Sequence, residues 1–141
     1  MTSIFISHNH KDNQYINSIK STVKNPNHSL FFDNTSLANP VYNSYGNINR
    51  RPPSDPASNP VKAEINALLS KTDKLLVILG NDTHSKEWVT WEIQSFVSRN
   101  GWGRILLMRT PDNYRGGAPE IASHLEVHDW NMNFLSKWIF N

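Results

Sequence analysis

Short apolar runs alternate along this chain with segments of helical periodicity. Nearly continuous apolar runs occupy residues 3–7, 30–32, 75–79 and 105–108, and a weaker run lies at 125–127. Runs of this length are typical of strands buried on both faces, as in a parallel sheet. Apolar residues spaced three or four positions apart predict helices over residues 16–23, 61–69, 89–97 and 133–140.

The order of these segments predicts the fold class. Strands that alternate with helices form α/β sandwiches, in which helices cover both faces of a mostly parallel sheet. A length of 141 residues fits one domain with its own core. We therefore expect a single domain over residues 1–141. Ser85 is a candidate N-cap of the third helix, and Gly101 lies just past its end.

One long segment departs from this alternation. Residues 34–60 contain five of the eight prolines and six asparagines, together with Tyr42, Tyr45 and the pair Arg50–Arg51. This composition predicts a long irregular loop, which in a compact domain is usually functional or disordered. Because it follows the second predicted strand, its start lies at the carboxyl edge of the sheet, where open α/β sheets bind ligands. A mobile insertion without function is the alternative.

The amino-acid composition excludes several kinds of functional site. The chain has no cysteine, which excludes disulfides, thiolate metal sites and thiol redox motifs. Its first residues lack the basic and apolar regions of a signal peptide, and its longest apolar run is too short to span a bilayer. We therefore expect a cytoplasmic protein without membrane contact. The net charge is only +2 and basic residues are scattered, so no nucleic-acid-binding surface is predicted, whereas an anionic nucleotide would suit this charge balance.

The start of the third predicted helix carries the most informative chemistry. Glu92 lies at the margin of the apolar stripe, one helical turn after Trp88 and next to Trp91. A carboxyl group beside indole rings loses hydration, which raises its pKa and strengthens its field on a nearby cation. The alternative is an ordinary amphipathic helix whose boundary glutamate points to solvent.

Polar residues also follow two of the predicted strands. Ser7 and His8 open a polar segment over residues 7–12, directly after the first strand. Such residues at a strand's carboxyl end can bind a ribose or a phosphate, although the same segment suits a capped turn. Asp33 closes the run 30–32, where a carboxylate can hold a ribose hydroxyl, coordinate a metal or cap a turn.

Common catalytic and binding motifs are absent from the sequence. It contains no GxGxxG, no P-loop, no GxSxG elbow and no HExxH. Two pairs among the six histidines are closely spaced, but neither pair matches a ligand signature. We therefore expect no metal site and no serine hydrolase.

Taken in order, these segments resemble a TIR-like domain, most closely the TIR-like component of Thoeris anti-phage systems. Residues 4–12 resemble the family's first strand and its polar turn, and residues 30–33 resemble its second strand with a terminal aspartate. Residues 65–80 resemble its second helix and third strand. Residues 85–93 resemble the helix start where Trp-x-x-x-Glu, here Trp88 and Glu92, ends in the catalytic glutamate.

The resemblance covers about residues 1–110 and carries expectations about fold and function. It implies a flavodoxin-like, TIR-type three-layer sandwich with five parallel strands in the order 2-1-3-4-5. It implies NAD as substrate with no separate cofactor, Glu92 as the catalytic residue, and a product derived from ADP-ribose that a separate effector protein senses. The substrate-binding residues that it implies are Phe5, Ser7, His8, Asp33 and Trp88. The long segment 34–60 replaces the family's usual short loop, so no loop residue is transferred, and a homo-oligomer stays an open alternative.

The implied reaction suits a single carboxylate. Breaking the nicotinamide–ribose bond leaves an oxocarbenium-like ribosyl cation, and nicotinamide departs neutral without needing a proton. A carboxylate at Glu92 can stabilise that cation, as one member of a glycosidase pair does. Two other interpretations stay open: a non-enzymatic TIR-type interaction module, and a nucleoside ribosyltransferase-like or other nucleotide-binding enzyme with the same sheet.

Overall fold

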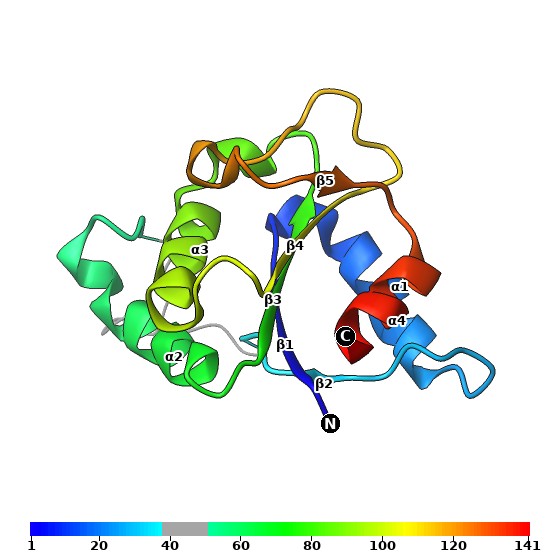
Figure 1. Ribbon diagram of the computed structural model, residues 1–141. Helices are drawn as coiled ribbons and strands as arrows, with labels where there is room; N and C mark the ends of the chain where they lie inside the picture. The colour runs from blue at the N-terminus through cyan, green and yellow to red at the C-terminus, as the bar shows by residue number, and fades with distance from the viewer. Residues whose placement is uncertain (38–50) are drawn as a thin grey trace.

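The computed structural model describes residues 1–37 and 51–141. Five parallel strands form one sheet in the order β2-β1-β3-β4-β5, which confirms the predicted flavodoxin-like order. The strands are β1 (Ser3–Ser7), β2 (Asp33–Asn34), β3 (Lys74–Leu79), β4 (Ile105–Arg109) and β5 (Val127–His128). The helices are α1 (Asn13–Lys24), α2 (Asn59–Leu69), α3 (Glu87–Asn100) and α4 (Met132–Phe140). Figure 1 shows α1 and α4 on one side of the sheet and α2 and α3 on the other, which makes three layers.

The core consists of two apolar clusters, one on each face of the sheet. In β3, Leu76 and Ile78 pack toward α1 and α4, whereas Leu75 and Val77 pack toward α2 and α3. All four residues have no exposed surface. Successive side chains of a strand point to opposite faces, so a central strand covered on both sides must be apolar at every position. This explains the uninterrupted run at 75–79.

The second predicted strand was placed wrongly. Residues 30–32 lie outside the sheet, although Leu30 and Phe32 are buried in the cluster under α1 and α4. The strand is β2, whose two residues pair with Ser3 and Ile4 of β1. A run of apolar residues indicates buried side chains, but it does not show whether their backbone pairs with a strand. Here the buried residues 30–32 come before the strand.

The start of one predicted helix and the end of the predicted irregular segment also shift. Ser85 belongs to a short 3₁₀ turn, Thr83–Ser85, and the N-cap residue of α3 is Lys86. Gly101 lies just past the end of α3 as predicted, with a positive φ of 72° that favours glycine. The irregular segment predicted over 34–60 ends before a 3₁₀ turn at Pro56–Ser58, and α2 follows directly. Residues 38–50 of that segment lie outside the described residues.

Within the described residues, none of the helices is long and apolar enough to cross a membrane.

Candidate functional site

A buried hydrogen bond joins the end of β1 to the first half of α3. The Ser7 hydroxyl donates to Oε1 of Glu92 over 2.7 Å. Ser7 is 1% exposed and Glu92 is 8% exposed. Ser7 is the last residue of β1, so this contact lies at the carboxyl edge of the sheet, where ligands bind in open α/β folds.

The periodicity of α3 explains why this carboxyl group is buried. Val89, Ile93 and Phe96 face the sheet with at most 1% of their surface exposed. Glu92 precedes Ile93, which turns its side chain to the margin of that stripe. On β1, side chains alternate between the faces, so Ser7 lies on the same face as Phe5, toward α3. The two patterns bring Ser7 and Glu92 together across 85 residues of sequence.

Burial raises the pKa of Glu92 to about 8, and the hydrogen bond from Ser7 opposes part of that rise. Burial removes hydration from the charged form, whereas a donated hydrogen bond favours it. The carboxyl group of the free protein is therefore mostly protonated at neutral pH. Bringing a cation to this group would favour its ionised form.

The two oxygens of the Glu92 carboxyl group differ in their contacts. Oε1 accepts the Ser7 bond, and among the described residues Oε2 has no hydrogen-bond partner. The hydrogen bond at Oε1 fixes the orientation of the carboxyl group and leaves Oε2 without a protein partner among those residues. A carboxylate with a fixed orientation can stabilise a positive charge that develops beside it.

Trp88 lies one helical turn before Glu92 and is half-buried. Its indole N–H donates to the carbonyl oxygen of Arg51 over 3.1 Å, and its ring meets that of Trp91 edge to face, with centroids 5.4 Å apart. Trp88 therefore ties the chain that precedes α2 to the helix that carries Glu92.

The other predicted site residues lie at different places. Phe5 is 2% exposed and packs in the core beneath Ser7 and α3, so it supports the site from inside. His8 follows Ser7, and its Nε2 lies 2.9 Å from Oδ1 of Asn13 at the start of α1. Asp33 pairs with Ser3 at the amino end of β1. The structure therefore brings Ser7, His8 and Glu92 to one edge and leaves Asp33 at the far end of the strand.

His8 lines a cavity of about 370 Å³ between α1 and the chain that follows β2. In that chain, the Ser36 hydroxyl accepts a 2.6 Å hydrogen bond from the backbone N–H of Ile6. β2 pairs only with Ser3 and Ile4 of β1, so the Ile6 N–H lies past the end of that pairing. The Ser36 hydroxyl provides the acceptor that this backbone donor needs. The full lining is His8, Asn13, Ile16, Asn17, Lys20, Asn34, Ser36 and Leu37.

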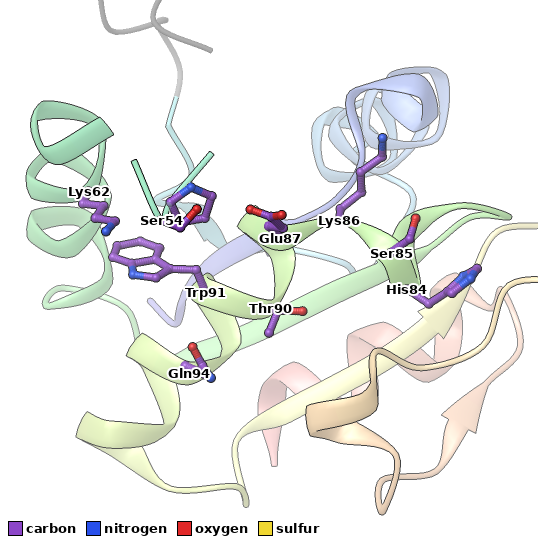
Figure 2. Close-up of a pocket in the computed structure, with 10 residues that line it drawn as sticks. Ser54, Lys62, His84, Ser85, Lys86, Glu87, Thr90, Trp91 and Gln94 are labelled. Atoms are coloured by element: carbon purple, nitrogen blue, oxygen red, sulfur yellow. The ribbon is translucent and has the colours of Figure 1, made fainter. Parts of the chain in front are cut away.

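A second cavity, of about 420 Å³, lies on the outward face of α3 (Figure 2). Figure 2 shows Lys62 of α2 and Trp91 of α3 turned toward one another on one side of this cavity. Glu92 is not part of the lining, because its side chain leaves α3 on the opposite face. The full lining is Pro53, Ser54, Lys62, His84, Ser85, Lys86, Glu87, Thr90, Trp91 and Gln94.

Sequence reasoning missed a buried polar cluster beside β3. Asp12 is 9% exposed and accepts a 3.4 Å hydrogen bond from Thr83, whose hydroxyl in turn accepts one from the Gly80 N–H over 2.8 Å. Burial, and then the nearby charge of Asp112, raises the pKa of Asp12. The sequence shows Asp12 only as a residue of the turn before α1, and no local signal links it to Thr83.

In the part of the chain that the structure describes, no three histidine, aspartate or glutamate side chains gather as a metal site would require.

The chain matches a known family over most of its length. The profile of the Thoeris protein ThsB TIR-like domain matches residues 5–115. The chain belongs to this family. The matched TIR-like region runs from β1 past β4 and contains Ser7, His8 and Glu92. No curated protein matches the chain.

Proposed function

We propose that this TIR-like domain cleaves the nicotinamide–ribose bond of NAD, with Glu92 as the catalytic residue. The observation that carries the proposal is the Glu92 carboxyl group, which is buried at the carboxyl edge, held at Oε1 by Ser7 and free at Oε2. Membership of the Thoeris TIR-like family supports it.

The bond that breaks joins C1′ of the ribose to the ring nitrogen of nicotinamide. Its electron pair leaves with nicotinamide, which becomes neutral, and the ribosyl group becomes an oxocarbenium-like cation. A carboxylate close to C1′ stabilises this cation most in the transition state, where the positive charge develops. Water that attacks the cation loses a proton and gives ADP-ribose, whereas attack by the adenine or by a hydroxyl gives a cyclic product or a conjugate.

The protonation state of Glu92 couples substrate binding to this chemistry. Its pKa near 8 means that the carboxyl group must lose a proton before it can act at neutral pH. The nicotinamide ring of NAD is itself cationic, so binding it beside Glu92 favours ionisation and releases the proton. Substrates without this charge would ionise Glu92 less readily, which favours NAD over neutral nucleosides.

We further propose that the product acts as a signal for a separate effector protein in anti-phage defence, in the cytoplasm, where NAD is present. Family membership supports this, because the matched profile describes one component of the Thoeris system. A protein-free filtrate of activated cells should then switch on the effector. An inert filtrate, with cells dying through loss of bulk NAD, would replace signalling by direct depletion.

Chromatography of NAD incubated with the purified protein tests the proposal, with and without lysate from phage-infected cells. We expect release of nicotinamide together with an ADP-ribose-derived product. Absence of nicotinamide in both conditions would favour a non-enzymatic interaction module. Cleavage of nucleosides in preference to NAD would instead favour a ribosyltransferase-like enzyme.

A further inference from the structure

We propose that Asp12 is a positioning residue for Glu92, because its side chain joins the turn after β1 to the loop that leads into α3. Asp12 follows Ser7 in the turn between β1 and α1, and its partner Thr83 precedes Glu92 in the loop between β3 and α3. The two segments that carry the bond from Ser7 to Glu92 are therefore joined a second time. The importance of this second contact for catalysis rests on the proposed function.

The side chain of Asp12 does not cap its own helix. Asp12 occupies the N-cap position of α1, where an aspartate usually accepts a hydrogen bond from a backbone N–H of the first turn. No such bond is present. Oδ2 of Asp12 instead accepts a 3.4 Å hydrogen bond from the Thr83 hydroxyl, which itself accepts a 2.8 Å bond from the Gly80 N–H at the end of β3. The carboxyl group is thus directed at the loop before α3.

The backbone at Gly80 leaves room for this carboxyl group. A Cβ at Gly80 would overlap the Asp12 carboxyl group. Among the described residues only Gly101 has a positive φ, so the close approach of Asp12 is what calls for glycine at position 80. Thr83 has no exposed surface and Asp12 is 9% exposed, so water scarcely competes for the bond between them.

The charges around Asp12 determine which variants separate geometry from electrostatics. Burial raises the pKa of Asp12 most, followed by the nearby charge of Asp112, while the hydrogen bond from Thr83 lowers it. His8 and Asp82 also act on this carboxyl group, His8 lowering its pKa and Asp82 raising it. A carboxyl oxygen accepts a hydrogen bond in either protonation state. The amide oxygen of an asparagine can therefore replace it without the charge.

An exposed ion pair joins the same two segments and supplies a control. Nζ of Lys11 lies 4.0 Å from Oδ2 of Asp82, and both side chains are well exposed to solvent. Such a pair contributes little to holding two segments together. Lys11→Met therefore tests whether any contact between the turn and the loop affects Glu92, or whether the buried contact of Asp12 is required.

The pKa of Glu92, measured by NMR titration of its side-chain carbon in the full chain, tests the inference without requiring turnover. Burial raises this pKa and the Ser7 bond lowers it, so the pKa reports how well that bond is kept. The variants are Asp12→Ala and Thr83→Val, which remove the contact, and Asp12→Asn and Thr83→Ser, which keep an acceptor or a hydroxyl. Thr83→Val preserves the shape of a buried side chain and supplies the test if Asp12→Ala does not fold.

We expect Asp12→Ala and Thr83→Val each to raise the pKa of Glu92 by roughly 0.5 pH unit, because a weaker Ser7 bond opposes burial less. The double variant should shift it no further than either single variant. Asp12→Asn, Thr83→Ser and Lys11→Met should keep the wild-type value.

An unchanged pKa of Glu92 in folded Asp12→Ala or Thr83→Val would overturn the inference. So would a lower pKa in both Asp12→Ala and Asp12→Asn, because loss of a negative charge that acts directly on Glu92 favours its ionised form. An equal rise in Lys11→Met would remove the specific role of Asp12. If the pKa shifts as expected but NAD releases no nicotinamide, the proposed reaction fails and the positioning of Glu92 by Asp12 stands.

Discussion

The Ser7 hydroxyl holds Oε1 of Glu92 at 2.7 Å, in a position that water scarcely reaches. Ser7 therefore orients the Glu92 carboxyl group, and the direct substrate contact that the family resemblance implies for Ser7 stays a prediction. This relationship has a measurable consequence, because the same bond lowers the pKa that burial raises.

Replacing Ser7 by alanine should raise the pKa of Glu92 further above 8. The substitution removes the one hydrogen bond that favours the charged carboxylate and leaves the burial unchanged. The expected shift is roughly one pH unit, so the rise of kcat/KM with pH should move upward by the same amount. NMR titration of the Glu92 side-chain carbon measures the pKa directly. Ser18→Ala, at an exposed position on α1, should leave it unchanged, and an unaltered pKa in Ser7→Ala would contradict the positioning role.

Glu92→Gln should make the protein more stable at neutral pH. Between the ordinary pKa of 4.5 and the folded value of about 8, the folded state keeps a proton that the unfolded chain has lost. The free energy of unfolding of the wild type therefore falls as pH rises through this window, whereas glutamine does not titrate. At pH 7 the gain is roughly 3 kcal/mol at most.

Urea unfolding at pH 5 and pH 8 measures this difference. The free energy of unfolding of Glu92→Gln should exceed that of the wild type only slightly at pH 5 and by much more at pH 8. Glu64→Gln, which changes an exposed glutamate of α2, should show no such dependence. An advantage of Glu92→Gln that is equal at both pH values would mean that Glu92 is ionised in the free protein.

The apolar core and the location of Glu92 could be predicted from the sequence, because both depend on local periodicity. Positions 75–79 are apolar throughout since β3 is covered on both faces, and Glu92 lies beside a helical stripe that is visible in the sequence. The strand order came from the family resemblance. Gly101 marked the end of α3 because few other residues tolerate its positive φ.

Contacts between distant segments could not be predicted. The bond from Ser7 to Glu92 depends on how β1 and α3 pack, and β2 follows the buried apolar residues 30–32 instead of containing them. Part of the lining of the cavity beside α1 does follow a pattern in the sequence, since Asn13, Asn17 and Lys20 recur at helical spacing on one face of α1. Their proximity to Asn34 required the fold.

Trp88→Phe should lower kcat/KM for NAD about five-fold without changing the pKa of Glu92. Phenylalanine keeps an aromatic ring but cannot donate to the Arg51 carbonyl, so the chain before α2 loses its bond to α3. Trp91→Phe is the matched control, because within the described residues the Trp91 indole N–H has no acceptor. Equal kinetics in Trp88→Phe and wild type would show that this bond does not serve the site.

The loop after β4 should be intolerant of a side chain at Gly116. A Cβ there would overlap the Gly80 carbonyl oxygen, whereas at Gly117 nothing lies within 4 Å of an added Cβ. Oδ1 of Asn113 accepts a 2.7 Å hydrogen bond from the Gly116 N–H. This bond keeps the Gly116 backbone close to Gly80. Gly116→Ala should therefore destabilise the fold by about 2 kcal/mol, and Gly117→Ala by less than about 0.5 kcal/mol. Thermal unfolding compares them, and equal melting temperatures would contradict the close approach.

The most direct test of the central claim is nicotinamide release from NAD by the wild type, Glu92→Gln and Glu64→Gln under conditions that activate the wild type. Circular dichroism and the stability measurements above establish that each variant is folded. The account predicts release by the wild type and by Glu64→Gln, and a loss of at least about 100-fold in Glu92→Gln, because the amide cannot offset the charge of the ribosyl cation. Nicotinamide release at the wild-type rate by folded Glu92→Gln would contradict it.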